Sequence, residues 1–109
     1  MKTYKLSKDK IAPLVLGMGG CLATDSITVE GHPVGYMYRE KPKNPTDSGW
    51  RFFSGFEDDA YMANKDNHAV YDVNTIANYD PSIIPYLSAS VGKAFERSDT
   101  SSAFNEIAE

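Results

Sequence analysis

The chain has 109 residues, of which 41% are hydrophobic and 24% charged. This composition is typical of one globular domain and excludes an extended disordered chain. Eleven basic and fifteen acidic residues give a net charge of −4, which argues against a protein that follows nucleic-acid phosphates. No run of about 20 apolar residues is present, so no association with a membrane is expected.

The first part of the chain is expected to contain two strand pieces. Residues 1–12 form a polar lead-in. The short apolar runs 14–16 and 21–24 follow, and the glycines between them allow a tight turn or a bulge.

The single cysteine, Cys21, cannot form an internal disulfide, which favours the reducing cytoplasm. Its apolar neighbours predict a buried, unreactive thiol. An alternative stays open, because four lysines and a short apolar stretch before Cys21 are similar to a lipoprotein signal. Asp9 and Pro13 interrupt that pattern, so we expect a cytoplasmic protein.

A hairpin is the clearest element of the sequence. Residues 34–39 alternate with a period of two, as expected of a strand. Residues 41–48 are rich in proline and polar side chains and predict an exposed loop. Residues 49–54 then return as a strand, with Trp50 and Phe52 on one face. Two strands joined in this way predict an antiparallel pair.

Short elements are predicted in the second half. Ser54 and Glu57 have the spacing of a capping box and predict a helix that ends near Ala63. Residues 64–67 are a turn, and residues 69–73 alternate like a strand.

The last third is predicted to be less regular. Residues 74–79 are polar and are expected to be irregular, with Asp80 and Pro81 starting a helix of one or two turns. Residues 93–97 predict a last strand, and Phe104 and Ile107 have the spacing of a short docked helix.

These elements indicate a single α+β domain over residues 1–109, with an antiparallel sheet of four to six short strands and two or three short helices.

Neither a metal site nor a catalytic centre is predicted. His32 and His68 are far apart in the sequence and do not form a metal-binding spacing with Cys21. No Gly-x-Ser-x-Gly nucleophile elbow is present. We therefore expect no cofactor and no enzymatic activity.

Charge is distributed unevenly along the chain, which indicates a binding protein. Residues 1–43 carry seven basic and four acidic residues, whereas residues 44–109 carry four basic and eleven acidic ones. The second part is therefore a candidate acidic surface for a basic partner. Aromatic and arginine side chains are typical of protein interfaces. The candidate partner-binding residues are Trp50, Arg51, Glu57, Asp58, Asp59 and Asp72.

Each of these candidates also has a structural interpretation. Trp50 is more often a core residue than an interface residue. Glu57, Asp58 and Asp59 have the positions of helix-capping residues. The alternative function, a small-molecule-binding regulatory or housekeeping domain, has Asn74, Asn78 and Tyr79 as candidate pocket residues.

Several segments of the chain resemble one bacterial family. They are Ala23-Thr-Asp-Ser-Ile-Thr28, Gly35-Tyr-Met-Tyr-Arg39, Asp47-Ser-Gly-Trp-Arg-Phe-Phe-Ser-Gly55, Tyr71-Asp-Val-Asn-Thr-Ile-Ala-Asn-Tyr-Asp-Pro81 and Val91-Gly-Lys-Ala-Phe-Glu-Arg97. The family is domain of unknown function 2185, which is similar to predicted immunity proteins of bacterial toxin systems. The resemblance covers about residues 20–97.

The resemblance implies a non-enzymatic α+β domain that binds one toxin and blocks it. It identifies no catalytic residue. Many such toxins act on nucleic acid and are basic, so the acidic second half fits a toxin as the partner. The resemblance does not indicate the oligomeric state.

Overall fold

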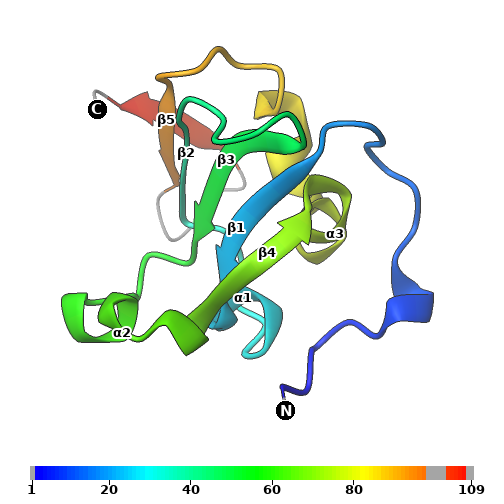
Figure 1. Ribbon diagram of the computed structural model, residues 1–109, viewed down its shortest axis with the longest axis vertical. Coiled ribbons are helices and arrows are strands. Elements are labelled where there is room, and N and C mark those ends of the chain that lie inside the picture. The colour runs from blue at the N-terminus through cyan, green and yellow to red at the C-terminus, as the bar shows by residue number, and fades with distance from the viewer. Residues whose placement is uncertain (1, 98–102, 108–109) are drawn as a thin grey trace.

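The strands form one six-stranded sheet in the order β4-β1-β3-β2-β5-β6 (Figure 1). The structure is a computed structural model that describes residues 2–97 and 103–107. The strands are β1 (Gly20–Thr24), β2 (Tyr36–Arg39), β3 (Asp47–Phe53), β4 (His68–Asp72), β5 (Ala94–Arg97) and β6 (Phe104–Ile107). The helices are α1 (Asp25–Thr28), α2 (Asp59–Ala63) and α3 (Val73–Tyr79), and the 3-10 helices are η1 (Lys8–Lys10), η2 (Lys65–Asn67) and η3 (Pro81–Tyr86). The predicted α+β class is confirmed.

The sheet is mixed, whereas the sequence predicted an antiparallel one. β1 and β3 are parallel, and the other neighbouring strands are antiparallel. After β1 the chain passes beyond the adjacent position to form β2, and the hairpin then inserts β3 between β1 and β2. The alternation within a strand does not show which strand becomes its neighbour, so the parallel pairing of β1 with β3 could not be predicted from the sequence.

The predicted hairpin is confirmed as β2 and β3. Tyr36 pairs with Phe53, and Arg39 pairs with Trp50. Gly49 has a φ of 90°, and a Cβ atom there would lie 2.2 Å from the carbonyl oxygen of Glu40. Only glycine fits this position, because both the φ and the close approach exclude a side chain.

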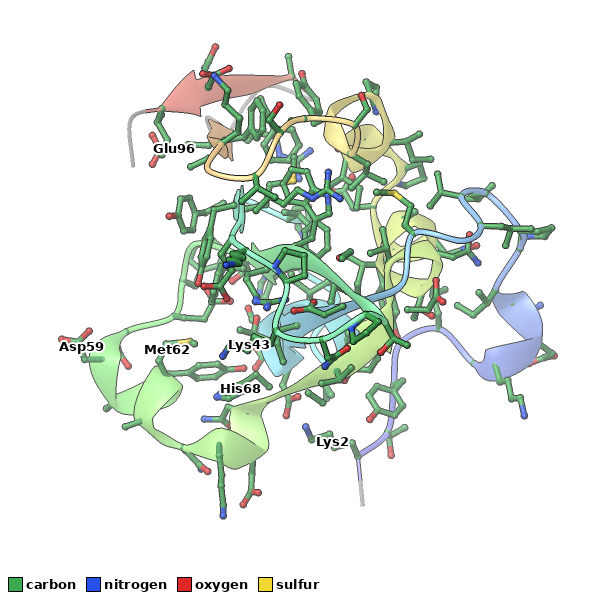
Figure 2. The ribbon with its side chains drawn as sticks, turned by 45° about the horizontal axis from the view of Figure 1, so that its top comes forward. Lys2, Lys43, Asp59, Met62, His68 and Glu96 are labelled. Atoms are coloured by element: carbon green, nitrogen blue, oxygen red, sulfur yellow. The ribbon has the colours of Figure 1, made fainter. Side chains whose placement is uncertain are left out.

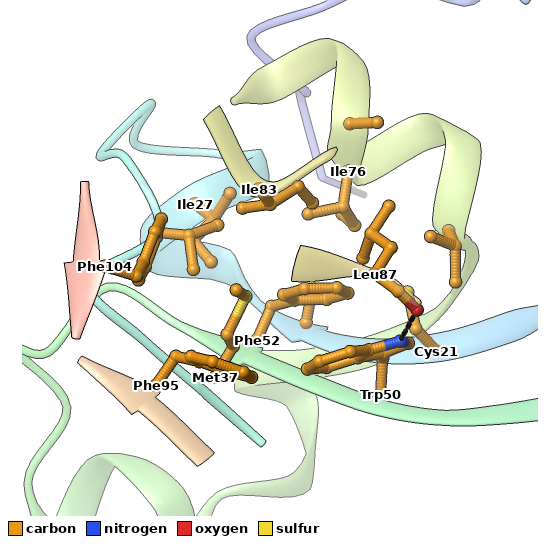
Figure 3. Close-up of a cluster of buried hydrophobic side chains, with 14 residues drawn as sticks. Cys21, Ile27, Met37, Trp50, Phe52, Ile76, Ile83, Leu87, Phe95 and Phe104 are labelled. Atoms are coloured by element: carbon orange, nitrogen blue, oxygen red, sulfur yellow. Dashed lines mark hydrogen bonds between the residues drawn. The ribbon is translucent and has the colours of Figure 1, made fainter. Parts of the chain in front are cut away.

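One face of the sheet is covered by α1, α3 and η3, and the core lies between them (Figure 3). The buried hydrophobic residues of this core are Cys21, Ala23, Ile27, Val34, Met37, Trp50, Phe52, Val73, Ile76, Ala77, Ile83, Leu87, Phe95 and Phe104. In β1 and β3 they alternate with residues of the other face, so the opposite face of the sheet carries a different set of side chains.

Residues 74–79 are helical, so the prediction of an irregular segment was wrong. Val73, Ile76 and Ala77 have the spacing of a helix and are buried against the sheet. The side chain of Asp72 accepts a hydrogen bond from the Asn74 amide and begins α3. The apolar periodicity was present in the sequence, but the polar residues between those positions obscured it.

The C-terminal segment forms a strand, and the predicted docked helix is wrong. β6 pairs with β5, with Ala94 opposite Ile107 and Arg97 opposite Phe104. A free strand edge offers a row of backbone hydrogen-bonding groups, and four residues gain more from these than from one helical turn. Residues 14–16, predicted as a strand piece, lie outside any strand.

The predicted capping box does not start a helix. Glu57 accepts a hydrogen bond from the Ser54 amide, as in such a box, but α2 begins at Asp59. Its N-cap is Asp58, whose carboxylate accepts a hydrogen bond from the Tyr61 amide. The other cap prediction is confirmed, because Asp80 caps η3 and Pro81 follows it.

Within residues 2–97 and 103–107, no helix has the length and apolar character needed to cross a membrane.

Candidate functional site

In residues 2–97 and 103–107, α1, α3 and η3 lie on the core face of the sheet, and no layer of helices covers the opposite face, which forms the candidate site. Strand pairing places Leu22 and Tyr38 on either side of Arg51. It also places Tyr36 between Phe53 and Glu96. Paired residues have side chains on the same face of a sheet, so two rows of side chains run across the strands. We call the following residues the open face: Leu22, Tyr36, Tyr38, Arg51, Phe53, Val70 and Glu96.

Three aromatic rings occupy the centre of the open face. The Tyr38 and Phe53 rings are stacked with centroids 5.8 Å apart, and Tyr36 lies 5.7 Å from each of the two. All three side chains are partly exposed. They are held by paired strands, so a partner would meet a preformed aromatic surface.

Three hollows lie along the open face, and two of them are lined by these rings. One of about 270 Å³ lies between Val70, Arg51 and the loop at Lys43. Another of about 110 Å³ is lined by Tyr38, Phe53, Met62 and His68, among others. The third, of about 430 Å³, is described below. Figure 2 labels Lys43, Met62, His68 and Glu96, which line these three hollows.

Arg51 is the centre of a buried ion-pair network within the open face. Its side chain is 3% exposed and binds Asp47 through two nitrogens, at 2.8 and 3.0 Å. Its Nε donates to Glu40 at 2.6 Å. The hydrogen bonds from Arg51 hold the pKa of Asp47 well below its ordinary value. The Arg51 guanidinium therefore forms ion pairs within the protein and is not available to a partner.

The Glu57 carboxylate is fixed beside the open face. It accepts hydrogen bonds from the Thr24 hydroxyl and from the backbone amides of Ser54 and Gly55. Burial alone would raise the Glu57 pKa, but these hydrogen bonds together lower it. Glu57 therefore carries a negative charge at neutral pH.

The other predicted acidic residues are separated in the structure. Asp58 and Asp59 are exposed at the start of α2, and Asp59 lies at the outer edge of the molecule in Figure 2. Asp72 is exposed on the edge strand β4, where it caps α3. Of the four predicted acidic residues, Glu57, Asp58 and Asp59 therefore lie together, and Asp72 lies apart from them.

Trp50 lies in the core, in agreement with its structural interpretation. Its side chain is 0% exposed, and its Nε1 donates a hydrogen bond to the carbonyl oxygen of Leu87 at 3.2 Å (Figure 3). Neither Trp50 nor Arg51 presents an accessible side chain to a partner.

The polar residues of the alternative pocket contact the chain itself. We call residues 2–16 the N-terminal arm. Asn74 accepts hydrogen bonds from the amides of Leu14 and Val15 and donates to the Ala12 carbonyl. Asn78 forms two further hydrogen bonds with the backbone of Ala12.

Tyr79 extends this contact to the beginning of the N-terminal arm. Its hydroxyl accepts a hydrogen bond from the Leu6 amide and donates to the Thr28 carbonyl. The polar groups expected to bind a small molecule are therefore occupied by backbone of the arm.

The variant Asn74→Ala is expected to loosen the N-terminal arm and to lower the free energy of unfolding by about 1–3 kcal/mol. The amide of Val15 would lose its acceptor, and the amide of Leu14 would keep only the Ala12 carbonyl oxygen. Urea denaturation gives the energy, and hydrogen exchange of these two amides reports on the arm. The exposed residue Asn105 provides the control, since Asn105→Ala should change neither. Unchanged exchange in Asn74→Ala would contradict the expected role.

The predicted buried thiol is confirmed. Cys21 is enclosed in the core, where burial raises the pKa of its thiol far above the ordinary value. His32 lies 3.7 Å from Glu30 and beside the ring of Phe56, while His68 is on β4. No cluster of three metal-binding side chains occurs in the part of the chain that the structure describes.

Several residues of the open face were not predicted from the sequence. Phe53, Val70 and Glu96 were not among the candidates, and neither was Met62, which lies on α2 beside the open face. The alternation of side chains along β3 and β5 could have indicated two of them. Phe52 and Phe95 are core residues, so their neighbours Phe53 and Glu96 point to the other face of the sheet. Their neighbours across the sheet could not be derived without the strand order.

The comparisons with known proteins identify a family. Residues 21–108 match the model of the Immunity protein Imm33 domain. No curated protein and no solved structure matches the chain. The match supports the expected likeness to immunity proteins, but it does not bear the name of domain of unknown function 2185. It extends beyond residue 97 and includes every strand from β2 to β6 and nearly all of β1. The chain therefore belongs to the Imm33 family of immunity protein domains.

Proposed function

We propose that this domain is an immunity protein that binds one toxin protein and blocks it through the open face, without catalysing a reaction itself. Membership of the Imm33 family supports the immunity role. We choose the open face as the binding surface because the aromatic side chains of Tyr36, Tyr38 and Phe53 cluster there.

An aromatic face that no helix of the described residues covers fits a binding surface. A sheet in an α+β domain usually presents polar side chains to water on its second face. Here that face carries aromatic side chains together with Leu22 and the exposed Val70. Tyrosine and other aromatic residues dominate the energetics of protein interfaces, and larger apolar patches mark interaction sites.

The acidic residues beside the open face support the proposal that the partner is basic. Glu57, Asp58 and Asp59 lie where the chain enters α2, and Met62 of α2 lines two of the hollows of the open face. The net charge of −4 has the same sign. Such a surface accelerates the encounter with a basic protein and disfavours acidic partners and nucleic acids. We place this encounter in the cytoplasm, in keeping with the single thiol.

The test is co-expression with the candidate toxin encoded by the neighbouring gene. The domain should restore growth and co-purify with the toxin, and raising the salt concentration should weaken the complex. Continued toxicity together with the absence of a complex would contradict the proposal.

The variant Val70→Arg is expected to weaken toxin binding at least about tenfold, which corresponds to about 1.4 kcal/mol. Val70 is 72% exposed on the open face, so the change places a cation on the surface with little cost to folding. Isothermal titration measures the affinity. The matched control is Val91→Arg in the loop before β5, because Val91 is 51% exposed. Equal affinities of the two variants would contradict the choice of surface.

The small-molecule alternative receives no support from Asn74, Asn78 and Tyr79, because their polar groups are bonded to the N-terminal arm and to the backbone of α1 and α3.

A further inference from the structure

A cleft at one end of the open face combines aromatic walls with two carboxylates. Its volume is about 430 Å³. The lining residues are Tyr36, Phe53, Gly55, Glu57, Met62 and Glu96. Tyr36 is paired with Phe53 on one side and with Glu96 on the other, so the two rings and the Glu96 side chain form one row.

The two carboxylates lie at opposite ends of this row. Glu57 accepts a hydrogen bond from Thr24 on β1, whereas Glu96 lies on β5. The strands β3 and β2 lie between β1 and β5. Three strand spacings separate β1 from β5, which is roughly 14 Å between backbones. Two carboxylates without a third metal-binding side chain among the described residues do not build a metal site, so an organic cation fits the cleft better.

Neither carboxylate has a basic ion-pair partner among the residues that the structure describes. In residues 2–97 and 103–107, Glu57 and Glu96 take part in none of the ion pairs. Two arginines of the sheet pair with other carboxylates, since Arg51 binds Asp47 and Glu40, and Arg97 binds Asp80. The cleft is therefore negative, and no cation of the described part of the chain is paired with its carboxylates.

The aromatic rings select the shape of the cation. The centroids of Tyr36 and Phe53 are 5.7 Å apart, with their planes inclined by only 31°. They offer a continuous face on which a planar guanidinium can stack, and arginine also forms paired hydrogen bonds with carboxylates. A lysine ammonium gains less from such a surface, because it is compact and strongly hydrated.

We propose that this cleft receives an arginine side chain of the partner protein, with its guanidinium over Tyr36 and Phe53 and between Glu57 and Glu96. This inference rests on the proposed function for the source of the arginine. Within that function, it identifies the group on a basic toxin that the open face recognises.

The probe is the peptide acetyl-Gly-Arg-Gly-amide, added to the isotope-labelled full chain and followed by NMR. Saturable shifts of the amides of Tyr36, Phe53 and Glu96 are expected. The same peptide with citrulline has almost the same shape without the charge, and it should bind at least about tenfold more weakly. Equal shifts with both peptides, or shifts confined to other surfaces, would overturn the inference.

Glu96→Gln removes one charge from the cleft and should weaken binding of the arginine peptide at least about threefold. Glu96 is exposed, so the fold should tolerate the change. The control Asp66→Asn removes the same charge at the exposed residue Asp66 of η2, outside the cleft. If both variants weaken binding equally, net charge alone acts, and the inference is wrong. Glu57→Gln serves as the second variant, with its fold checked by the amide spectrum.

The toxin complex separates this inference from the proposed function. If the toxin binds and Val70→Arg weakens it while Glu96→Gln does not, the function stands and the arginine cleft is refuted. If no toxin binds but the arginine peptide does so with the stated selectivity, the cleft stands and the immunity function fails.

Discussion

Trp50→Ala is expected to lower the free energy of unfolding by about 3–5 kcal/mol. The Trp50 ring has no exposed surface, and it stacks on Phe52 with centroids 5.9 Å apart and an angle of 13°. The ring of Phe95 on β5 lies near the Trp50 ring, with centroids 6.3 Å apart. A loss of this size is a large fraction of the about 5–15 kcal/mol typical of a domain. Urea denaturation followed by circular dichroism measures it.

Trp50→Phe is the matched variant for this prediction. It keeps an aromatic ring but removes Nε1, so the carbonyl oxygen of Leu87 loses its side-chain donor. Its expected cost is about 1–3 kcal/mol, smaller than that of the alanine variant. A cost of Trp50→Ala below about 1 kcal/mol would contradict the assignment of Trp50 to the core.

Asp47→Ala is expected to cost about 3–5 kcal/mol of stability at neutral pH, because among the described residues it leaves the buried Arg51 charge with Glu40 as its one acidic partner. The Asp47 carboxylate also accepts hydrogen bonds from the amides of Lys43 and Gly49, which would lose their acceptor. Chemical denaturation at pH 7 measures the loss. The double variant Asp47→Ala with Arg51→Met should recover part of it, since no buried charge remains.

The pH dependence of stability provides an independent check on Asp47. The pKa of Asp47 is lower in the folded protein than in the unfolded chain, mainly because of Arg51. The unfolded chain therefore binds the proton more readily, and the stabilisation is present above the unfolded value of about 3.9. It is lost as the pH falls below that value. The stability of Asp47→Ala should fall less between about pH 4 and pH 2 than that of the unchanged protein, and parallel curves would contradict the role of Asp47.

The local elements of the fold followed from the sequence. The alternation in residues 34–39 and 49–54 predicted the hairpin, and Asp80-Pro81 predicted the start of η3. Both signals act between residues that are close in the chain, where the spacing of side chains determines which of them share a face. The placement of Trp50 and Phe52 on one face is a further example, since both are buried.

The candidate site depended on contacts that no local pattern encodes. The parallel pairing of β1 with β3 brings Leu22 beside Arg51, and the pairing of β2 with β5 brings Glu96 beside Tyr36. Arg51 was predicted to be accessible, yet Asp47 and Glu40 bury and neutralise it.

The sequence by itself determined the α+β class, the hairpin, the buried thiol of Cys21 and the resemblance to immunity proteins. Only the tertiary structure decided which face of the sheet stays uncovered and that the N-terminal arm occupies the polar groups of α3. The physical reason is that hydrophobic periodicity specifies which residues of a strand share a face, while the order of the strands and the docking of the arm depend on contacts between distant parts of the chain.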